Sequence, residues 1–138
     1  MSGKILYIED NSMNMRLIQV ILRRTEYEFI GAESGLLGIE KAQQEKPSLI
    51  LLDINMPEMD GIEVCEKLRA LPEFTETPII ALTAWATENE REEYIKQGFN
   101  DLLAKPVNRF VLLSMIDNFI GSKAPRSGTI DKPSPPST

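Results

Sequence analysis

Five side chains in this sequence could together carry out phosphoryl transfer. Three carboxylates, a hydroxyl and an ammonium each stand at the end of a short apolar run: Glu9, Asp10, Asp53, Thr83 and Lys105. Three unpaired carboxylates packed together repel one another, and a hard divalent cation such as Mg²⁺ relieves this repulsion. A carboxylate oxygen could then be the nucleophile, while the metal, the lysine and the threonine stabilise the phosphoryl oxygens.

Short parallel strands are the elements that would bring these side chains together. Apolar runs of strand length alternate with segments of helical character, five times over. The predicted strands are 4–8, 27–32, 48–53, 79–83 and 100–104. This alternation predicts a parallel sheet with helices on both faces. In such sheets the ligand site lies outside the carboxyl ends of the strands, where the strand order reverses.

Polar caps indicate where the intervening helices begin. The capping candidates are Asn11 or Ser12, Ser34, Thr87 and Asn108. The helices after them are predicted to end near residues 22, 44, 97 and 120, and a further helix follows the turn at 56–61 and stops near Pro72. In the first helix the apolar residues recur at helical spacing: Met13, Leu17, Ile18, Ile21 and Leu22.

The composition indicates one domain and excludes several kinds of chemistry. A chain of 138 residues and 15.6 kDa is too short for two separate cores. Its 21 acidic and 15 basic residues give a net charge of -6, which argues against direct nucleic-acid binding. The sequence has no histidine, which excludes a Ser/His/Asp triad, a histidine metal site and a phosphohistidine of its own.

Cysteine content and hydropathy point to the compartment. The single cysteine, Cys65, cannot form an internal disulfide and is expected to be a small packed hydrophobe. No apolar run approaches the roughly 20 residues of a membrane span, and signal-peptide features are absent. We therefore expect a cytoplasmic protein without membrane contact. Residues 1–121 are expected to form the domain, and the Pro- and Ser-rich residues 122–138 a flexible tail or linker.

The residues at the predicted strand ends, taken together, resemble a known family. The matching segments are Glu9-Asp10, Asp53 with Met56-Pro57 and Asp60-Gly61, Thr83-Ala84, and Lys105-Pro106. They are similar to the receiver domain of two-component response regulators, over about residues 3–121. The resemblance implies a flavodoxin-like α/β fold, a doubly wound (βα)5 sandwich with a five-stranded parallel sheet of order 2-1-3-4-5.

The resemblance implies a metal site built from four residues. Asp10 and Asp53 would bind Mg²⁺ (or Mn²⁺) through carboxylate oxygens. Glu9 would hold waters of the metal, and Asn55 would supply its backbone carbonyl.

The resemblance also implies the residues that handle the phosphoryl group. Asp53 would be the phosphoacceptor, and Lys105 would pair with a phosphoryl oxygen or, at rest, with Asp53. Thr83 would move its hydroxyl onto the phosphoryl group and pull the loop that begins with Ala84. The peptide bond before Pro106 is often cis in such domains.

One position departs from the family pattern. The family often places Tyr or Phe three residues before the lysine, as a switch that turns inward, and this chain has Leu102 there. The nearest large aromatic residue after Thr83 is Trp85. We hypothesise that Trp85 reports or helps to gate the change; the alternative is a tryptophan on the surface or against the fourth helix.

The resemblance implies partners rather than an enzymatic activity of the chain itself. A histidine kinase or a histidine phosphotransfer protein would donate the phosphoryl group, and a downstream protein would read the result. The domain would assist its own phosphorylation and dephosphorylation without being an enzyme. The last predicted helix is rich in apolar residues, and its face could bind a partner or form a homodimer. The chain would be a stand-alone regulator, a relay intermediate or the receiver of a hybrid kinase.

Three other functions remain as alternatives. The first is a receiver-like interaction module that never accepts phosphate. The second is a phosphatase with an aspartyl nucleophile, which is disfavoured because Asn55 stands where such an enzyme needs an acid. The third is flavin binding, which is disfavoured because the loop after the first strand is acidic where a phosphate cradle needs hydroxyls and amides.

Overall fold

The computed structural model of the chain describes residues 3–121, and its centre is a single sheet. Five parallel strands lie in the order β2-β1-β3-β4-β5. They are β1 (Lys4–Ile8), β2 (Glu28–Ala32), β3 (Leu49–Asp53), β4 (Ile79–Thr83) and β5 (Asp101–Ala104). This order confirms the predicted flavodoxin-like fold, and it reverses direction between β1 and β3, where the site is expected.

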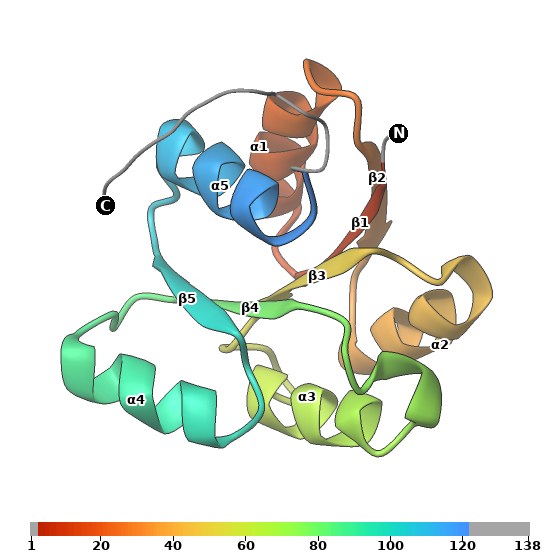
Figure 1. Cartoon of the computed structure of the whole chain (residues 1–138), viewed down its shortest axis with the longest axis vertical. Helices are drawn as coiled ribbons and strands as arrows, with labels where there is room; N and C mark the ends of the chain where they lie inside the picture. Colours follow the sequence, from red (N-terminus) through yellow and green to blue (C-terminus); the bar gives the residue numbers. More distant parts are fainter. Residues whose placement is uncertain (1–2, 122–138) are drawn as a thin grey trace.

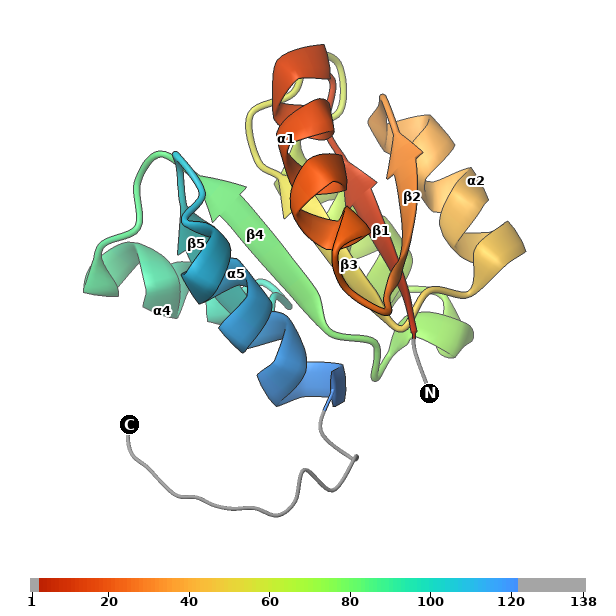
Figure 2. The ribbon, with the colours of Figure 1, turned by 90° about the horizontal axis from the view of Figure 1, so that it is seen from above.

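Helices cover both faces of the sheet, α1 and α5 on one face and α2, α3 and α4 on the other (Figure 1). Figure 2 looks onto the α1–α5 face. The helices are α1 (Ser12–Arg23), α2 (Gly35–Glu45), α3 (Gly61–Arg69), α4 (Glu88–Lys96) and α5 (Arg109–Ile116). A short 3-10 helix spans Pro72–Phe74, and a π-helical turn spans Asp117–Gly121. The caps are side-chain acceptors of Asn11, Ser34, Asp60, Thr87 and Asn108, and all but Asp60 were predicted.

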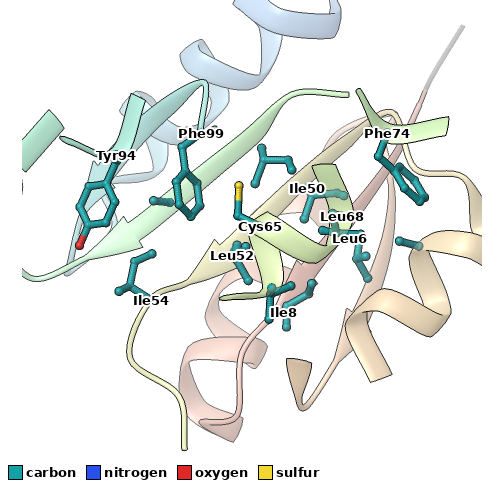
Figure 3. Close-up of a cluster of buried hydrophobic side chains, with 14 of the residues drawn as sticks. Leu6, Ile8, Ile50, Leu52, Ile54, Cys65, Leu68, Phe74, Tyr94 and Phe99 are labelled. Atoms are coloured by element: carbon teal, nitrogen blue, oxygen red, sulfur yellow. The ribbon is translucent and has the colours of Figure 1, made fainter. Parts of the chain in front are cut away.

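Two apolar cores lie on opposite sides of the sheet because side chains alternate along each strand. Ile5 and Tyr7 of β1 belong to the core under α1 and α5, whereas Leu6 and Ile8 belong to the core under α2, α3 and α4. Figure 3 shows the latter core. Cys65 is fully buried in it, which confirms its prediction as a packed hydrophobe, and burial raises the pKa of its thiol to about 11.

The structure differs from the sequence prediction in several details. Met13 and Leu17 share the helical spacing of α1 but are exposed, because the buried stripe is narrower and consists of Ile18 and Leu22. The last α-helix ends at Ile116 instead of continuing to about residue 120, and the chain goes on as a π-helical turn. The predicted tail, 122–138, lies outside the described residues. Within residues 3–121, the helices are too short or too polar to span a membrane.

Candidate functional site

Three carboxylates from two strand ends meet at the carboxyl edge of the sheet. One carboxylate oxygen from each of Glu9, Asp10 and Asp53 lies within 4.8 Å of the others. Glu9 follows β1, and Asp53 is the last residue of β3, the neighbouring strand. The side chains of Glu9 and Asp53 are 1% exposed, whereas Asp10 is exposed at the mouth of the site. The predicted convergence of these three acids is therefore what the topology produces.

Lys105 provides the positive charge of the site. Its Nζ donates a hydrogen bond of 2.5 Å to Oδ1 of Asp53 and lies 3.7 Å from Oε1 of Glu9. The lysine follows β5, the second strand from β3, and the Lys105-Pro106 peptide bond is cis, as in many members of the resembling family. The lysine thus contacts the aspartate that the family resemblance predicts to be the phosphoacceptor.

The charge balance of this cluster is negative. The pKa of Asp53 is raised from its ordinary 3.8 to about 6. Burial is the largest cause and the charge of Glu9 acts in the same direction, while the hydrogen bond and the charge of Lys105 partly oppose them. Three carboxylates near one ammonium repel one another, and a divalent cation would relieve this repulsion. Carboxylate oxygens are the ligands that Mg²⁺ prefers, so the donor set fits this metal. A cavity of about 300 Å³ opens beside Glu9 and Asp10 and is walled by α1.

Both carboxylate oxygens of Glu9 accept hydrogen bonds. The hydroxyl of Tyr7 donates to Oε1 at 2.7 Å, and the backbone N–H of Asn11 donates to Oε2 at 3.2 Å. Burial and the neighbouring carboxylate raise the pKa of Tyr7 above its ordinary range, so the hydroxyl remains a donor. Sequence reasoning missed Tyr7. The available signal was a tyrosine in an aliphatic strand, two residues before an acid, because residues two apart share a strand face.

Thr83 is the last residue of β4, the strand beside β3, and its hydroxyl has a hydrogen-bond partner outside the carboxylate cluster. It is buried, and its Oγ1 accepts a hydrogen bond of 3.1 Å from the backbone N–H of Trp85. Alternation along β4 places its side chain on the same strand face as Ala81, on the α2–α4 side of the sheet. Ala84 and Trp85 follow in an exposed loop, and the Trp85 residue is 68% exposed.

The remaining predicted residues lie at the border of the site. Asn55 is exposed, at the beginning of the loop between β3 and α3. Backbone hydrogen bonds fix both ends of that loop: the Ile54 N–H donates to the carbonyl oxygen of Leu82, and the Gly61 N–H donates to the carbonyl oxygen of Ile54. Leu102 is buried in the α2–α4 core, which also contains the edge-to-face aromatic pair of Tyr94 and Phe99. The two side chains of this aromatic pair, which share the core with Leu102, therefore come from α4 and from the loop between α4 and β5.

Comparison with known sequences identifies the family. The family profile described as "Response regulator receiver domain" matches residues 5–117. The chain is 39% identical over 103 residues to the signal transduction histidine-protein kinase BarA of Escherichia coli (strain K12), a match that covers 75% of this chain and 11% of BarA. It is 32% identical over 121 residues to the polar-differentiation response regulator DivK of Brucella ovis, covering 88% of this chain and 98% of DivK. The chain belongs to the response regulator receiver domain family.

Solved structures agree with this assignment. The receiver domain of the sensor histidine kinase PA1611 from Pseudomonas aeruginosa PAO1, which has a magnesium ion in its active-site cleft, superposes with a TM-score of 0.79 at 34% identity. That match covers 88% of this chain and all of the other, 100%. The receiver domain of Saccharomyces cerevisiae Ssk1, in complex with the histidine phosphotransfer protein Ypd1, superposes with a TM-score of 0.78 at 25% identity, covering 84% of this chain and 87% of that chain. Receiver domains are phosphorelay signalling modules that pair with histidine kinases and phosphotransfer proteins.

Proposed function

We propose that this chain accepts a phosphoryl group on Asp53 from a phosphohistidine of a partner protein. The observation that carries the proposal is a buried aspartate that is paired with Lys105 and has carboxylate oxygens of two further acids within 4.8 Å, in a chain without histidine. An Oδ atom of Asp53 would attack phosphorus and form an acyl phosphate. The phosphorus–nitrogen bond of the donor breaks, and the imidazole nitrogen keeps the electron pair and takes a proton from solvent.

Three residues would divide the work at the phosphoryl group. Lys105, which now holds Oδ1 of Asp53, would transfer its hydrogen bond to a phosphoryl oxygen. Thr83 would donate its hydroxyl to another phosphoryl oxygen, which requires it to give up its bond to the Trp85 N–H. That exchange would pull the exposed loop that begins at Ala84 and so change a surface of the protein.

The metal requirement is part of the proposal. Asp10 and Asp53 would bind Mg²⁺ (or Mn²⁺) with carboxylate oxygens, Glu9 would hold its waters, and Asn55 would contribute a backbone carbonyl. When bound, the metal supplies positive charge at the phosphoryl oxygens. Because the acyl phosphate is labile, the same groups would assist its hydrolysis, and the chain would regulate the lifetime of its own signal.

The proposed output is recognition by a downstream protein. A groove of about 450 Å³ lies along α5 and the start of β5, and Phe110 and Val111 line it, with the Phe110 residue 72% exposed. Phe110 and Val111 are among the apolar residues of the last helix that could bind a partner, which supports this part of the proposal. A homodimer through the same face would be seen as a doubled mass in light scattering.

A small phosphoryl donor tests the proposal without the unidentified partner. Wild-type protein incubated with phosphoramidate and Mg²⁺ should gain one phosphoryl group by intact mass, and EDTA or Asp53→Asn should prevent the gain. Asp60→Asn is the matched control, because Asp60 caps α3 outside the carboxylate cluster. A wild type that stays unlabelled with Mg²⁺ present would favour the alternative function, an interaction module that works without phosphorylation.

A further inference from the structure

A buried tyrosine is the next-to-last residue of β1, a strand whose other buried residues are aliphatic. Tyr7 is 1% exposed and packs in the core under α1 and α5. Residues two apart along extended chain face the same side, so Tyr7 and Glu9, the residue that follows β1, point to the same side of the sheet. The tyrosine hydroxyl reaches Oε1 of Glu9 at 2.7 Å. A buried hydroxyl needs a hydrogen-bond partner, and here that partner belongs to the carboxylate cluster.

The Glu9 carboxylate is held from two directions. Tyr7 donates to Oε1, and the N–H of Asn11, the capping residue of α1, donates to Oε2. Lys105 Nζ lies 3.7 Å from the same Oε1, which is an ion-pair distance but longer than its 2.5 Å bond to Asp53. Two donors on two different oxygens define the orientation of the carboxylate plane.

We infer that Tyr7 is a positioning residue, which holds Glu9 in orientation for the metal and keeps Lys105 available to Asp53. Without the hydroxyl, Oε1 of Glu9 loses its donor, and Lys105 is the nearest cation to replace it. A lysine drawn to Glu9 would leave Asp53, and Glu9 would turn away from the metal side. The inference deepens the proposed function and rests on its metal and acceptor roles.

Tyr7→Phe tests this inference because it removes a single oxygen atom and keeps the packed ring. We expect the Mg²⁺ dissociation constant, measured by isothermal titration calorimetry, to rise about tenfold, as for other groups that orient metal ligands. Labelling by phosphoramidate at subsaturating Mg²⁺ should slow in parallel. Tyr94→Phe is the matched control: Tyr94 is also buried, but it packs on the opposite face of the sheet against Phe99. Urea unfolding of both variants reports any loss of packing.

A double-mutant cycle with Glu9→Gln separates positioning from a merely structural role. If Tyr7 acts through the Glu9 carboxylate, Tyr7→Phe should change the Mg²⁺ dissociation constant less than twofold in the Glu9→Gln background. Wild-type Mg²⁺ affinity in Tyr7→Phe, or an equal tenfold loss in both backgrounds, would overturn the inference while the proposed function stands. A wild type that takes up neither Mg²⁺ nor a phosphoryl group would overturn the proposed function, and the inference with it.

Discussion

Two polar clusters stand at opposite ends of the sheet and differ in how completely their charges are paired. Near the amino ends of β4 and β5, the Arg69 guanidinium donates to four acceptors at 2.5 to 3.0 Å. The acceptors are the carbonyl oxygens of Phe74, Thr77 and Gly98 and the Oδ1 of Asn100. At the carboxyl ends, Glu9, Asp10 and Asp53 cluster around one ammonium, that of Lys105.

The difference separates a structural cluster from a site. The acceptors of Arg69 come from two segments of the chain, 74–77 before β4 and 98–100 before β5. The arginine therefore joins α3 to both segments, and few of its donors are left for a ligand. The carboxylate cluster has more negative charge than its lysine can balance, and burial makes that excess costly. This excess of negative charge is the physical reason why we propose that the metal and the phosphoryl group bind at the carboxylate end of the sheet.

The largest expected effect is the loss of phosphoryl uptake in Asp53→Asn. The amide cannot act as the nucleophile, so labelling by phosphoramidate should fall to the background of the unlabelled protein. Stability should not fall with it, because the substitution removes one of two buried carboxylates that repel each other. Urea unfolding at pH 7 in EDTA checks this expectation, and a clear destabilisation would mean that the Asp53–Lys105 pair is a structural contact like those of Arg69.

Arg69→Met should do the reverse, with a loss of stability and no loss of chemistry. The substitution removes the Arg69 donor from three carbonyl oxygens, whereas the Oδ1 of Asn100 keeps its hydrogen bond from the Ile79 N–H. We expect a loss of about 3 kcal/mol in the free energy of unfolding. At a temperature where the variant is folded, phosphoramidate labelling should match that of wild type. Lys67→Met on the exposed side of α3 is the control. A slower labelling rate in Arg69→Met would show that the two ends of the sheet are coupled.

Asp53 should also make the metal-free protein less stable as the pH rises. Its pKa is about 6 in the folded state and 3.8 as the ordinary value, so between these pH values the unfolded chain releases a proton that the folded chain keeps. Stability is therefore lost as the pH rises from about 4 to about 6, by roughly 3 kcal/mol, and levels off above.

Urea unfolding in EDTA across this range measures the effect, with Asp53→Asn as the reference because it lacks the titrating group. The unfolding free energy of wild type minus that of the variant should decrease as the pH rises, because only wild type loses stability through Asp53. A difference that increases with pH would mean that Lys105 outweighs burial at this site.

Most of the site could be predicted because it depends on strand ends rather than on side-chain packing. Asp53 ends an unbroken apolar run, and such a run is typical of a central parallel strand. The neighbouring acids follow the other central strand, and topology alone brings the two strand ends together. Thr83 and Lys105 follow from the same argument. The caps of α1, α2, α4 and α5 were predictable because a single side chain makes each of them.

What could not be predicted depends on contacts between segments far apart or on side-chain reach. In the sequence, Arg69 is an ordinary arginine of a helix. Its hydrogen bonds to the segments before β4 and β5 depend on the tertiary fold and could not be predicted. The Tyr27 hydroxyl contacts Asp117, 90 residues away, at the point where α5 changes to a π-helical turn. Met13 and Leu17 follow the helical period, but periodicity does not say how wide the buried stripe is.

Magnesium should stabilise the carboxylate end of the sheet and leave the arginine end unaffected. At a Mg²⁺ concentration ten times the dissociation constant, mass action adds about 1.4 kcal/mol to the free energy of unfolding. Asp10→Asn should reduce this gain, because it removes the exposed member of the carboxylate cluster, whereas Arg69→Met should keep the full gain despite its lower stability. A Mg²⁺-induced gain that Asp10→Asn leaves intact would place the metal elsewhere.

The smallest expected effect concerns Trp85. Its backbone N–H donates to the hydroxyl of Thr83, the hydroxyl that is proposed to bind the phosphoryl group. Trp85 is the chain's single tryptophan, so its fluorescence reports one position. Mg²⁺ with beryllofluoride, a phosphoryl analogue, should change its emission as Thr83 turns toward Asp53, and Thr83→Ala should abolish the change. Trp85→Phe should alter stability by less than about 0.5 kcal/mol, since the ring is largely exposed. If the analogue binds and the emission stays constant, Trp85 is a surface residue without a part in switching. A conformational signal from the carboxylate cluster would then have to reach the surface without moving the loop at Ala84 and Trp85.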